Sequence, residues 1–306
     1  MPITWKKTSE DTVQTPYIKA PSSFKVFQYI NDIHINVIQS EETRSLIIAH
    51  TKEDGTLIPA RLHLGMKRVL ELCAATYTIA GTKEFKKAIN HTYIPQKQAL
   101  SAMLIREPIA QSPFLNTFLG SGFESRLYAV MDVHHVKDKK GIKGVSGRVC
   151  SYRIDIPEEK NKQIHDDIKI GILYDSIAGG RNLIAAVDDL KKKFKNIEKF
   201  VFVSVYASYQ GCIRVNKYCE ERGIKAEFFC MHELLDASPL NEYDCFYPKW
   251  NICKEDEDIL KTFYKEKYHD ICMGGDWTAN ALGVEQAIEV FDIQMKELGL
   301  PNDFDI

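Results

Sequence analysis

Residues 175–182, Asp-Ser-Ile-Ala-Gly-Gly-Arg-Asn, lie between an apolar run and a helical apolar pattern. Phosphate is the ligand that such a junction favours, because a helix N-terminus offers unpaired N–H groups and glycines let the backbone approach an anion closely. Ser176 and Asn182 can add side-chain donors, and Arg181 can neutralise charge. Asp175 suits a ribose hydroxyl, or a Mg²⁺ ion that accompanies a pyrophosphate, better than a phosphate alone. The segment therefore predicts a site for a phosphorylated ligand.

The same residues also allow a purely structural interpretation. Asp175 and Asn182 could cap the helix, and the two glycines could simply turn the chain. The segment matches neither the G-x-x-x-x-G-K-[ST] loop nor the G-x-G-x-x-G fingerprint. On the segment alone, both interpretations stay open.

The composition of the whole chain narrows the class of protein. Its 306 residues are 44% hydrophobic, which is enough for one large domain or two modest ones. The net charge of -2 provides no general attraction for nucleic acid or anionic lipid. Residues 1–17 are polar and no apolar run reaches the length of a membrane span. We therefore expect a soluble, cytoplasmic protein that binds neither nucleic acid nor membranes.

The cysteines give no sign of a metal site. None of the 8 cysteines forms a C-x-x-C pair, and several lie in apolar patterns, as Cys73 and Cys272 do. Buried, reduced thiols are the usual outcome in such a setting. Cys245 and Cys253 could join a histidine around a metal, but their spacing is not that of a zinc site. We expect no metal ligands from the protein itself.

The elements that position the segment 175–182 alternate regularly. Residues 168–174, 199–205 and 225–231 have the composition of strands, and helical patterns lie between them. The first helix would bury Leu183, Ile184, Val187, Leu190 and Phe194; the second would end at Gly223, where a left-handed residue is needed. Alternation of this kind implies right-handed crossovers and a parallel sheet.

The rest of the chain extends this pattern. We expect an N-terminal arm in residues 1–25, irregular over 11–24, and a single domain over 26–306. Further expected elements are a helix at 62–77, strands at 99–105, 126–133 and 148–154 around a basic turn at 137–144, a strand at 269–273 and a helix at 280–299. The fold class is α/β, a doubly wound and mostly parallel sheet flanked by helices, with an added β-hairpin arm at about 126–156. Ligands bind such sheets at the carboxyl ends of strands, where residues 175–182 lie.

Several segments, in order, resemble the type I phosphoribosyltransferases, and most of all the uracil phosphoribosyltransferases. Residues 174–186 resemble the family's Asp-Pro-x-x-Ala-Thr-Gly-Gly loop for phosphoribosyl pyrophosphate (PRPP) and the Ala-Ala of the helix that follows. In 102–110, Arg106 aligns with the arginine of the family's Leu-Arg-Ala-Gly-Leu. Residues 273–283, Met-Gly-Gly-Asp-Trp-Thr-Ala-Asn-Ala-Leu-Gly, are similar to its base-recognition segment, Gly-Leu-Gly-Asp-Phe-Gly-Asp-Arg-x-x-Gly.

The resemblance implies an enzyme that transfers phosphoribosyl from PRPP to a nitrogen base, uracil-like or another heterocycle, and releases pyrophosphate. The partners would be PRPP and the base, with Mg²⁺ arriving with PRPP, and the protein would form a homodimer. Asp175 and Arg106 would be catalytic, the latter by binding pyrophosphate with Mg²⁺. PRPP would be bound by Asp175, Ser176, Ile177, Ala178, Gly179, Gly180, Arg181 and Asn182. The base would be bound within a segment at about 270–284, by Gly274, Gly275, Asp276 and Trp277.

The chain also departs from the family's pattern. Its PRPP loop is one residue shorter and lacks the threonine and the proline. Ala279 and Asn280 replace an aspartate and an arginine in the base segment, and residues 132–141 replace the family's Arg-Asp-Glu-Glu-Thr arm. These departures motivate a second hypothesis, a non-catalytic protein of the same fold that binds PRPP or a nucleotide as a regulator or in an assembly. A phosphate-ester hydrolase is a third hypothesis with weaker support, because the sequence shows no cluster of metal ligands.

Overall fold

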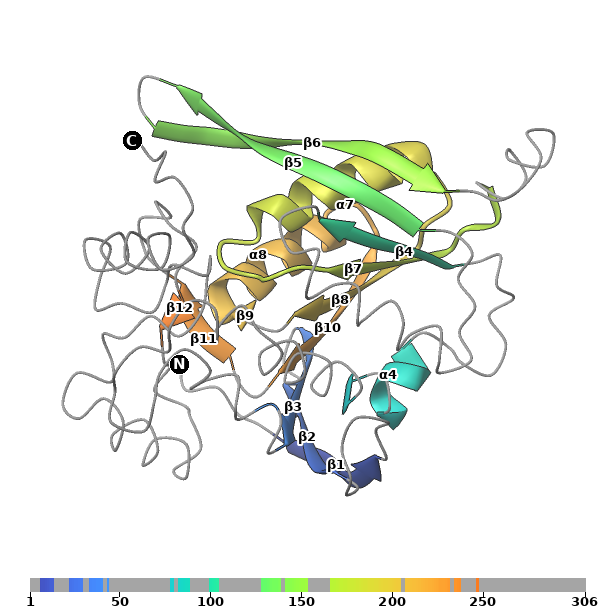
Figure 1. The fold of residues 1–306 in the computed structure, drawn as a ribbon, viewed down its shortest axis with the longest axis vertical. Helices are drawn as coiled ribbons and strands as arrows, with labels where there is room; N and C mark the ends of the chain where they lie inside the picture. Colours follow the sequence, from blue (N-terminus) through green and yellow to red (C-terminus); the bar gives the residue numbers. More distant parts are fainter. Residues whose placement is uncertain are drawn as a thin grey trace, which may run out of the picture.

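The computed structural model describes residues 6–13, 22–29, 33–40, 43, 78–79, 82–88, 99–104, 128–138, 141–153, 166–204, 207–231, 234–237 and 246–247 (Figure 1). The helices predicted at 62–77 and 280–299 and the strand predicted at 269–273 lie outside these residues.

A nine-stranded sheet forms the centre of the described structure, in the order β1-β2-β3-β10-β8-β7-β4-β5-β6. Its strands are β1 (Lys6–Val13), β2 (Ser22–Tyr29), β3 (His34–Ser40), β4 (Ala99–Leu104), β5 (Tyr128–Asp138), β6 (Gly141–Arg153), β7 (Ile170–Tyr174), β8 (Lys199–Ser204) and β10 (Lys225–Met231). All pairs from β3 through β10, β8, β7 and β4 to β5 are parallel. Only β1/β2, β2/β3 and β5/β6 are antiparallel. The mostly parallel α/β sheet is therefore confirmed.

Helices flank both faces of this sheet. On one face, α7 (Arg181–Lys193) and α8 (Tyr209–Glu220) share a buried apolar cluster with Phe202 and Phe228, whose rings stack at 4.9 Å. Neighbouring residues of a strand point to opposite faces, so Phe229 points away from that cluster. Its ring meets Phe85 of α4 (Lys83–Ala88) edge-on, at 5.1 Å. The strands are apolar on both faces because both are covered.

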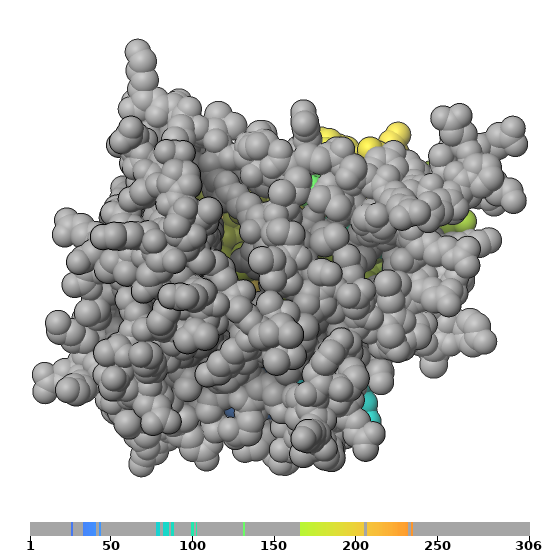
Figure 2. All heavy atoms as spheres, viewed as in Figure 1, coloured from blue at the N-terminus to red at the C-terminus, as the bar shows by residue number. Residues whose placement is uncertain are grey.

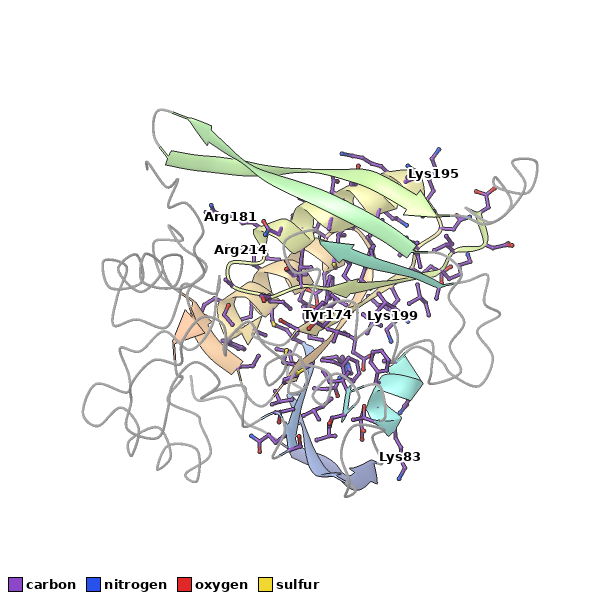
Figure 3. All side chains as sticks on the ribbon, viewed as in Figure 1. Lys83, Tyr174, Arg181, Lys195, Lys199 and Arg214 are labelled. Carbon is purple, nitrogen blue, oxygen red and sulfur yellow. The ribbon has the colours of Figure 1, made fainter. Side chains whose placement is uncertain are left out.

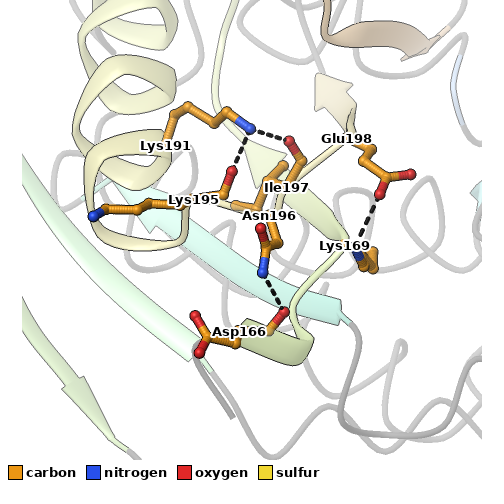
Figure 4. Close-up of polar contacts among 7 residues, drawn as sticks. All are labelled: Asp166, Lys169, Lys191, Lys195, Asn196, Ile197 and Glu198. Carbon is orange, nitrogen blue, oxygen red and sulfur yellow. Dashed lines mark hydrogen bonds and ion pairs between the residues drawn. The ribbon is translucent and has the colours of Figure 1, made fainter. Parts of the chain in front are cut away.

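The first predicted helix, α7, buries Leu183, Val187 and Leu190 as expected, and Ala185 and Ala186 in addition, whereas Ile184 is only half-buried. Its C-terminal end is closed by Lys191, whose Nζ donates to the carbonyls of Lys195 and Ile197, each at 2.6 Å (Figure 4). The basic end of the helix thus bonds the turn that leads to β8, where a cation also complements the helix dipole.

The second predicted helix, α8, is followed by Gly223 with a φ of 66°. The N–H of Ile224 donates to the carbonyl of Cys219 at 3.0 Å, which closes the last turn before β10. The left-handed glycine expected at this position is confirmed, and so is the order strand, helix, strand, helix, strand from β7 to β10.

Two expectations about local structure were wrong. Residues 11–24, which we expected to be irregular, include the end of β1 and the start of β2, which pair antiparallel; β2 also pairs with β3 and buries Val26. The edge of the sheet supplies hydrogen-bond partners that a local sequence pattern cannot reveal. In the hairpin, β5 runs to Asp138 and β6 begins at Gly141, so most of the basic segment 137–144 is strand rather than turn.

The order of the strands places a switch point beside the segment 175–182. In the sheet, β5 and β6 follow β4 on one side, and β8 and β10 follow β7 on the other. The direction in which successive strands are added therefore reverses between β4 and β7. Tyr174, the last residue of β7, pairs with Met103 of β4 and with Val203 of β8. Ligands of open α/β sheets bind at the carboxyl ends of strands at such a point.

A small second sheet, β12-β11-β9, lies next to α8; its strands are β9 (Ala207–Ser208), β11 (Leu234–Ala237) and β12 (Phe246–Tyr247). Figure 2 shows described residues reaching the viewed face in few places, among them the cyan atoms of α4 at the lower edge. Among the described helices, none has the length and apolar character needed to cross a membrane.

Candidate functional site at the carboxyl end of strand β7

The site begins at Asp175, the residue after β7. Its N–H donates to the carbonyl of Val203 at 3.2 Å, which extends the pairing of β7 with β8 by one residue. The side chain of Asp175 is buried, with 6% of the residue exposed, and Ile177 and Ala178 are buried as well. The segment is thus packed into the body of the protein, and a carboxylate at the edge of the sheet is held in a defined place.

The residues that begin α8 hold the next part of the segment. Ile177 forms a parallel bridge with Ala207, and the N–H of Ser208 donates to the carbonyl of Ile177 at 2.7 Å. The hydroxyl of Ser208 donates to the carbonyl of Ala178 and accepts the N–H of Gly211 at 2.9 Å, so it also caps α8. Nη1 of Arg214 donates to the carbonyl of Gly179 at 2.5 Å. We refer to Ser208, Gly211 and Arg214 as the loop anchor.

The loop anchor fixes the direction of three successive peptide groups. In a trans peptide the C=O and the N–H point in opposite directions, and the described chain has no cis peptide bond. Because the carbonyls of residues 177–179 are turned toward α8, the N–H groups of Ala178, Gly179 and Gly180 point away from it. No described residue accepts a hydrogen bond from these N–H groups. A series of N–H groups that face the same way in a turn is a concave site for an anion.

Gly180 joins this series to α7 as the N-cap residue, in the left-handed conformation (φ 75°, ψ 2°), and no side chain caps the helix. The expectation that Asp175 and Asn182 could cap it is therefore wrong. A Cβ on Gly180 would lie 2.8 Å from both the carbonyl oxygen of Gly211 and Cγ2 of Val215. The close approach to α8 thus explains why position 180 is a glycine, whether or not a ligand binds. Because glycine has no side chain, the N–H groups of the first turn of α7 have no side-chain acceptor from the cap.

The other predicted residues of the segment lie around these N–H groups. Ser176, Arg181 and Asn182 are half-buried, and Oδ1 of Asn182 is buried with no hydrogen bond to a described residue. Arg181 and Arg214 lie at the N-terminal end of α7 (Figure 3), and neither forms an ion pair within the described part of the chain. Two guanidinium groups therefore give this end of the segment a positive charge.

The remaining predicted site residues lie outside the described residues. These are Arg106, two residues beyond the end of β4 at Leu104, and the base-binding residues Gly274, Gly275, Asp276 and Trp277. The described residues contain no group of three or more His, Cys, Asp or Glu side chains that could hold a metal ion.

Three cysteines whose side chains the structure describes are buried, unreactive thiols. Cys212, Cys219 and Cys230 are free and buried. Burial raises the pKa of Cys219 to about 12, and burial together with a hydrogen bond to Cys230 raises the pKa of Cys212 well above its ordinary value. Since the thiolate is the nucleophile, these side chains are packing residues at neutral pH. The expectation of buried, reduced thiols is confirmed for these three.

The sequence patterns did not lead us to predict the role of the loop anchor. The signal was present in Ser208-x-x-Gly211, because serine at an N-cap bonds the N–H three residues on, as Ser208 does. A glycine inside a helical pattern also suggests close packing. A Cβ on Gly211 would lie 2.3 Å from the carbonyl oxygen of Ala178. Arg214 carried no such signal, since an arginine on a helix is ordinarily a surface residue.

No family model and no curated protein matches the chain. Among solved structures, one that matches is that of the AQ2163 protein from Aquifex aeolicus, at 15% sequence identity and a TM-score of 0.41. The match covers 74% of this chain and 93% of that one. At this TM-score the likeness carries no argument about function.

Proposed function

We propose that the chain is a phosphoribosyltransferase-like protein that binds PRPP with Mg²⁺ at the carboxyl end of β7 and transfers its phosphoribosyl group to a nitrogen base, with release of pyrophosphate. The observation that carries this proposal is the series of N–H groups from Ala178 to Gly180, directed away from α8 and placed three residues after the carboxylate of Asp175. A sugar phosphate needs both features, one for its phosphate and one for its hydroxyls.

The phosphate half of the ligand would lie on the backbone. The N–H groups from Ala178 to Asn182 supply donors, and the partial positive charge of the α7 N-terminus favours a dianion there. Arg181 adds a full charge beside them. Backbone donors that are already oriented cost little reorganisation when the ligand binds. The 5′-phosphate of PRPP is the group that we assign to this position.

Asp175 would then hold the ribose hydroxyls. When the C1–O bond to pyrophosphate breaks, its electron pair leaves with pyrophosphate and positive charge develops on the sugar ring. A buried carboxylate next to the ring would stabilise that charge more strongly than the neutral ground state, which is what lowers a barrier. The base nitrogen then forms the new bond to C1, and its proton passes to solvent water.

The position proposed for the pyrophosphate group of PRPP rests on the family resemblance and on the order of the strands. β4 ends at Leu104, beside the end of β7, and Arg106 follows two residues later in the sequence. A guanidinium group has a fork of donors that suits phosphoryl oxygens. Mg²⁺, as part of the substrate, would neutralise charge on the leaving pyrophosphate.

A panel of bases tests the proposed reaction, with pyrophosphate release and the nucleotide product measured for each base in the presence of Mg²⁺ and PRPP. We expect turnover with at least one nitrogen heterocycle, and we expect that uracil is not the best substrate. Ala279 and Asn280 change the polar groups of the base segment, and an unmatched buried polar group costs about 1–3 kcal/mol.

Two outcomes would change this account. A specificity constant for uracil in the usual range of about 10⁴–10⁸ M⁻¹s⁻¹, above that of every other base, would contradict the substrate prediction. Binding of PRPP without pyrophosphate release for any base would favour the second candidate function, a non-catalytic PRPP or nucleotide-binding regulator. The specific observation behind that candidate is the PRPP loop, one residue short and without its threonine.

A further inference from the structure

The Gly179–Gly180 peptide group joins the two adjacent glycines of the segment 175–182. Glycine occupies positive and negative φ about equally well, so a peptide between two glycines can reverse its direction at low cost. One direction presents the N–H of Gly180 to an anion, and the other presents the carbonyl of Gly179 and repels it. A neighbouring group has to select between the two.

Arg214 is that neighbouring group. The bond from its Nη1 to the carbonyl of Gly179 holds the oxygen toward α8 and the N–H of Gly180 away from it. The carbonyls of Ile177 and Ala178 are held from the backbone and hydroxyl of Ser208, which is fully buried, whereas Arg214 is exposed. The two earlier peptide groups are therefore fixed by the core, and the third depends on one surface side chain.

We propose that Arg214 is a positioning residue for phosphate binding: it selects the anion-binding direction of the Gly179–Gly180 peptide and so raises the affinity for the 5′-phosphate of the ligand. This inference rests on the proposed function. The population in the binding-competent direction multiplies the intrinsic affinity, so a residue that shifts this population changes affinity without touching the ligand.

Calorimetric titration with ribose 5-phosphate, and with PRPP and Mg²⁺, tests the inference on the full chain. We expect Arg214→Ala to bind both ligands about 3- to 10-fold more weakly, which is the range for the loss of one hydrogen bond. Arg214→Lys should recover part of this loss, since lysine keeps a charged donor but not the planar fork. Melting temperatures should change little, because the side chain is exposed.

Arg222→Ala is the matched control. Arg222 is an exposed arginine just beyond the other end of α8, and its Nη1 also donates to a backbone carbonyl, that of Tyr218 at 3.2 Å. The Arg222→Ala variant should bind ribose 5-phosphate and PRPP as tightly as the wild type does. With glycine-selective ¹⁵N labelling, the amide signal of Gly180 in the free protein should broaden or double in Arg214→Ala and not in Arg222→Ala.

The outcomes separate the inference from the function on which it rests. If the wild type binds both ligands and Arg214→Ala binds them equally well, the positioning role is wrong while the proposed function stands. A uniform fall in melting temperature and affinity for both arginine variants would mean a general structural role instead. If the wild type binds neither ligand, the proposed function is wrong and the inference is lost with it.

Discussion

Replacement of Asp175 by asparagine is expected to lower turnover by about 10²–10³-fold, the range found when one electrostatic contact to a transition state is removed. The substitution preserves the shape of a buried side chain and removes its charge. Because positive charge on the ribose is greatest in the transition state, kcat should fall more than the affinity for PRPP. Steady-state kinetics with PRPP and the best base, together with calorimetric binding, would separate the two.

Asp188→Asn is a suitable control for this prediction. Asp188 is an aspartate of α7 outside the segment 175–182, and it accepts hydrogen bonds from Lys192 at 2.5 Å and from Tyr218 at 3.0 Å. The hydrogen bond from Lys192 lowers the pKa of Asp188, so the wild-type side chain is charged at neutral pH and Asp188→Asn removes one charge, as Asp175→Asn does. Turnover should be unchanged in this variant. Equal losses for Asp175→Asn and Asp188→Asn would contradict a role for Asp175 in the reaction.

The second large effect is expected from Gly211→Ala. The added methyl group would lie 2.3 Å from the carbonyl oxygen of Ala178 and 3.0 Å from Oγ of Ser208, so α8 and the segment 175–182 would have to separate. Overpacking and the loss of buried hydrogen bonds should together cost about 2–4 kcal/mol of unfolding free energy. PRPP binding should also weaken at least about 10-fold, because the peptide groups lose their fixed direction.

Gly223→Ala separates this steric effect from the general cost of replacing a glycine. Gly223 has a φ of 66° but nothing within 4 Å of an added Cβ, so only the left-handed backbone is strained. About 1 kcal/mol is the expected cost, with no effect on ligand affinity. Chemical denaturation would measure the unfolding free energy of both variants, and calorimetry would measure their affinity for PRPP. Similar stability and affinity in the two would show that the contact between Gly211 and Ala178 does not hold the segment in place.

The fold around the site was predictable where local patterns agree with tertiary structure. The apolar stretches that became β7, β8 and β10 and the helix face with Leu183, Val187 and Leu190 are set by residue periodicity, and Gly223 by the backbone it must adopt. The place of Asp175 at the end of β7 followed from the same pattern. Local and global preferences coincide there, so the sequence was sufficient.

What could not be predicted depends on partners far along the chain. Ser208 and Arg214 bond residues 30 and 35 positions away, so their roles appear only when α8 packs against the segment. The capping alternative for α7 failed for a related reason: Asp175 and Asn182 have good capping chemistry, but the chain must approach α8 closely at Gly180. The strands within residues 1–25 depend likewise on the pairing of β2 with β3.

The central claim is that PRPP with Mg²⁺ binds at residues 175–182, and calorimetric titration of the full wild-type chain tests it most directly. We expect saturable binding with a dissociation constant of about 1 μM–1 mM, the range in which most enzymes meet their substrates. At a hundred times that constant, the ligand should stabilise the folded state by about 2.7 kcal/mol and raise the melting temperature accordingly. The absence of both heat and a melting shift at millimolar PRPP would contradict the account.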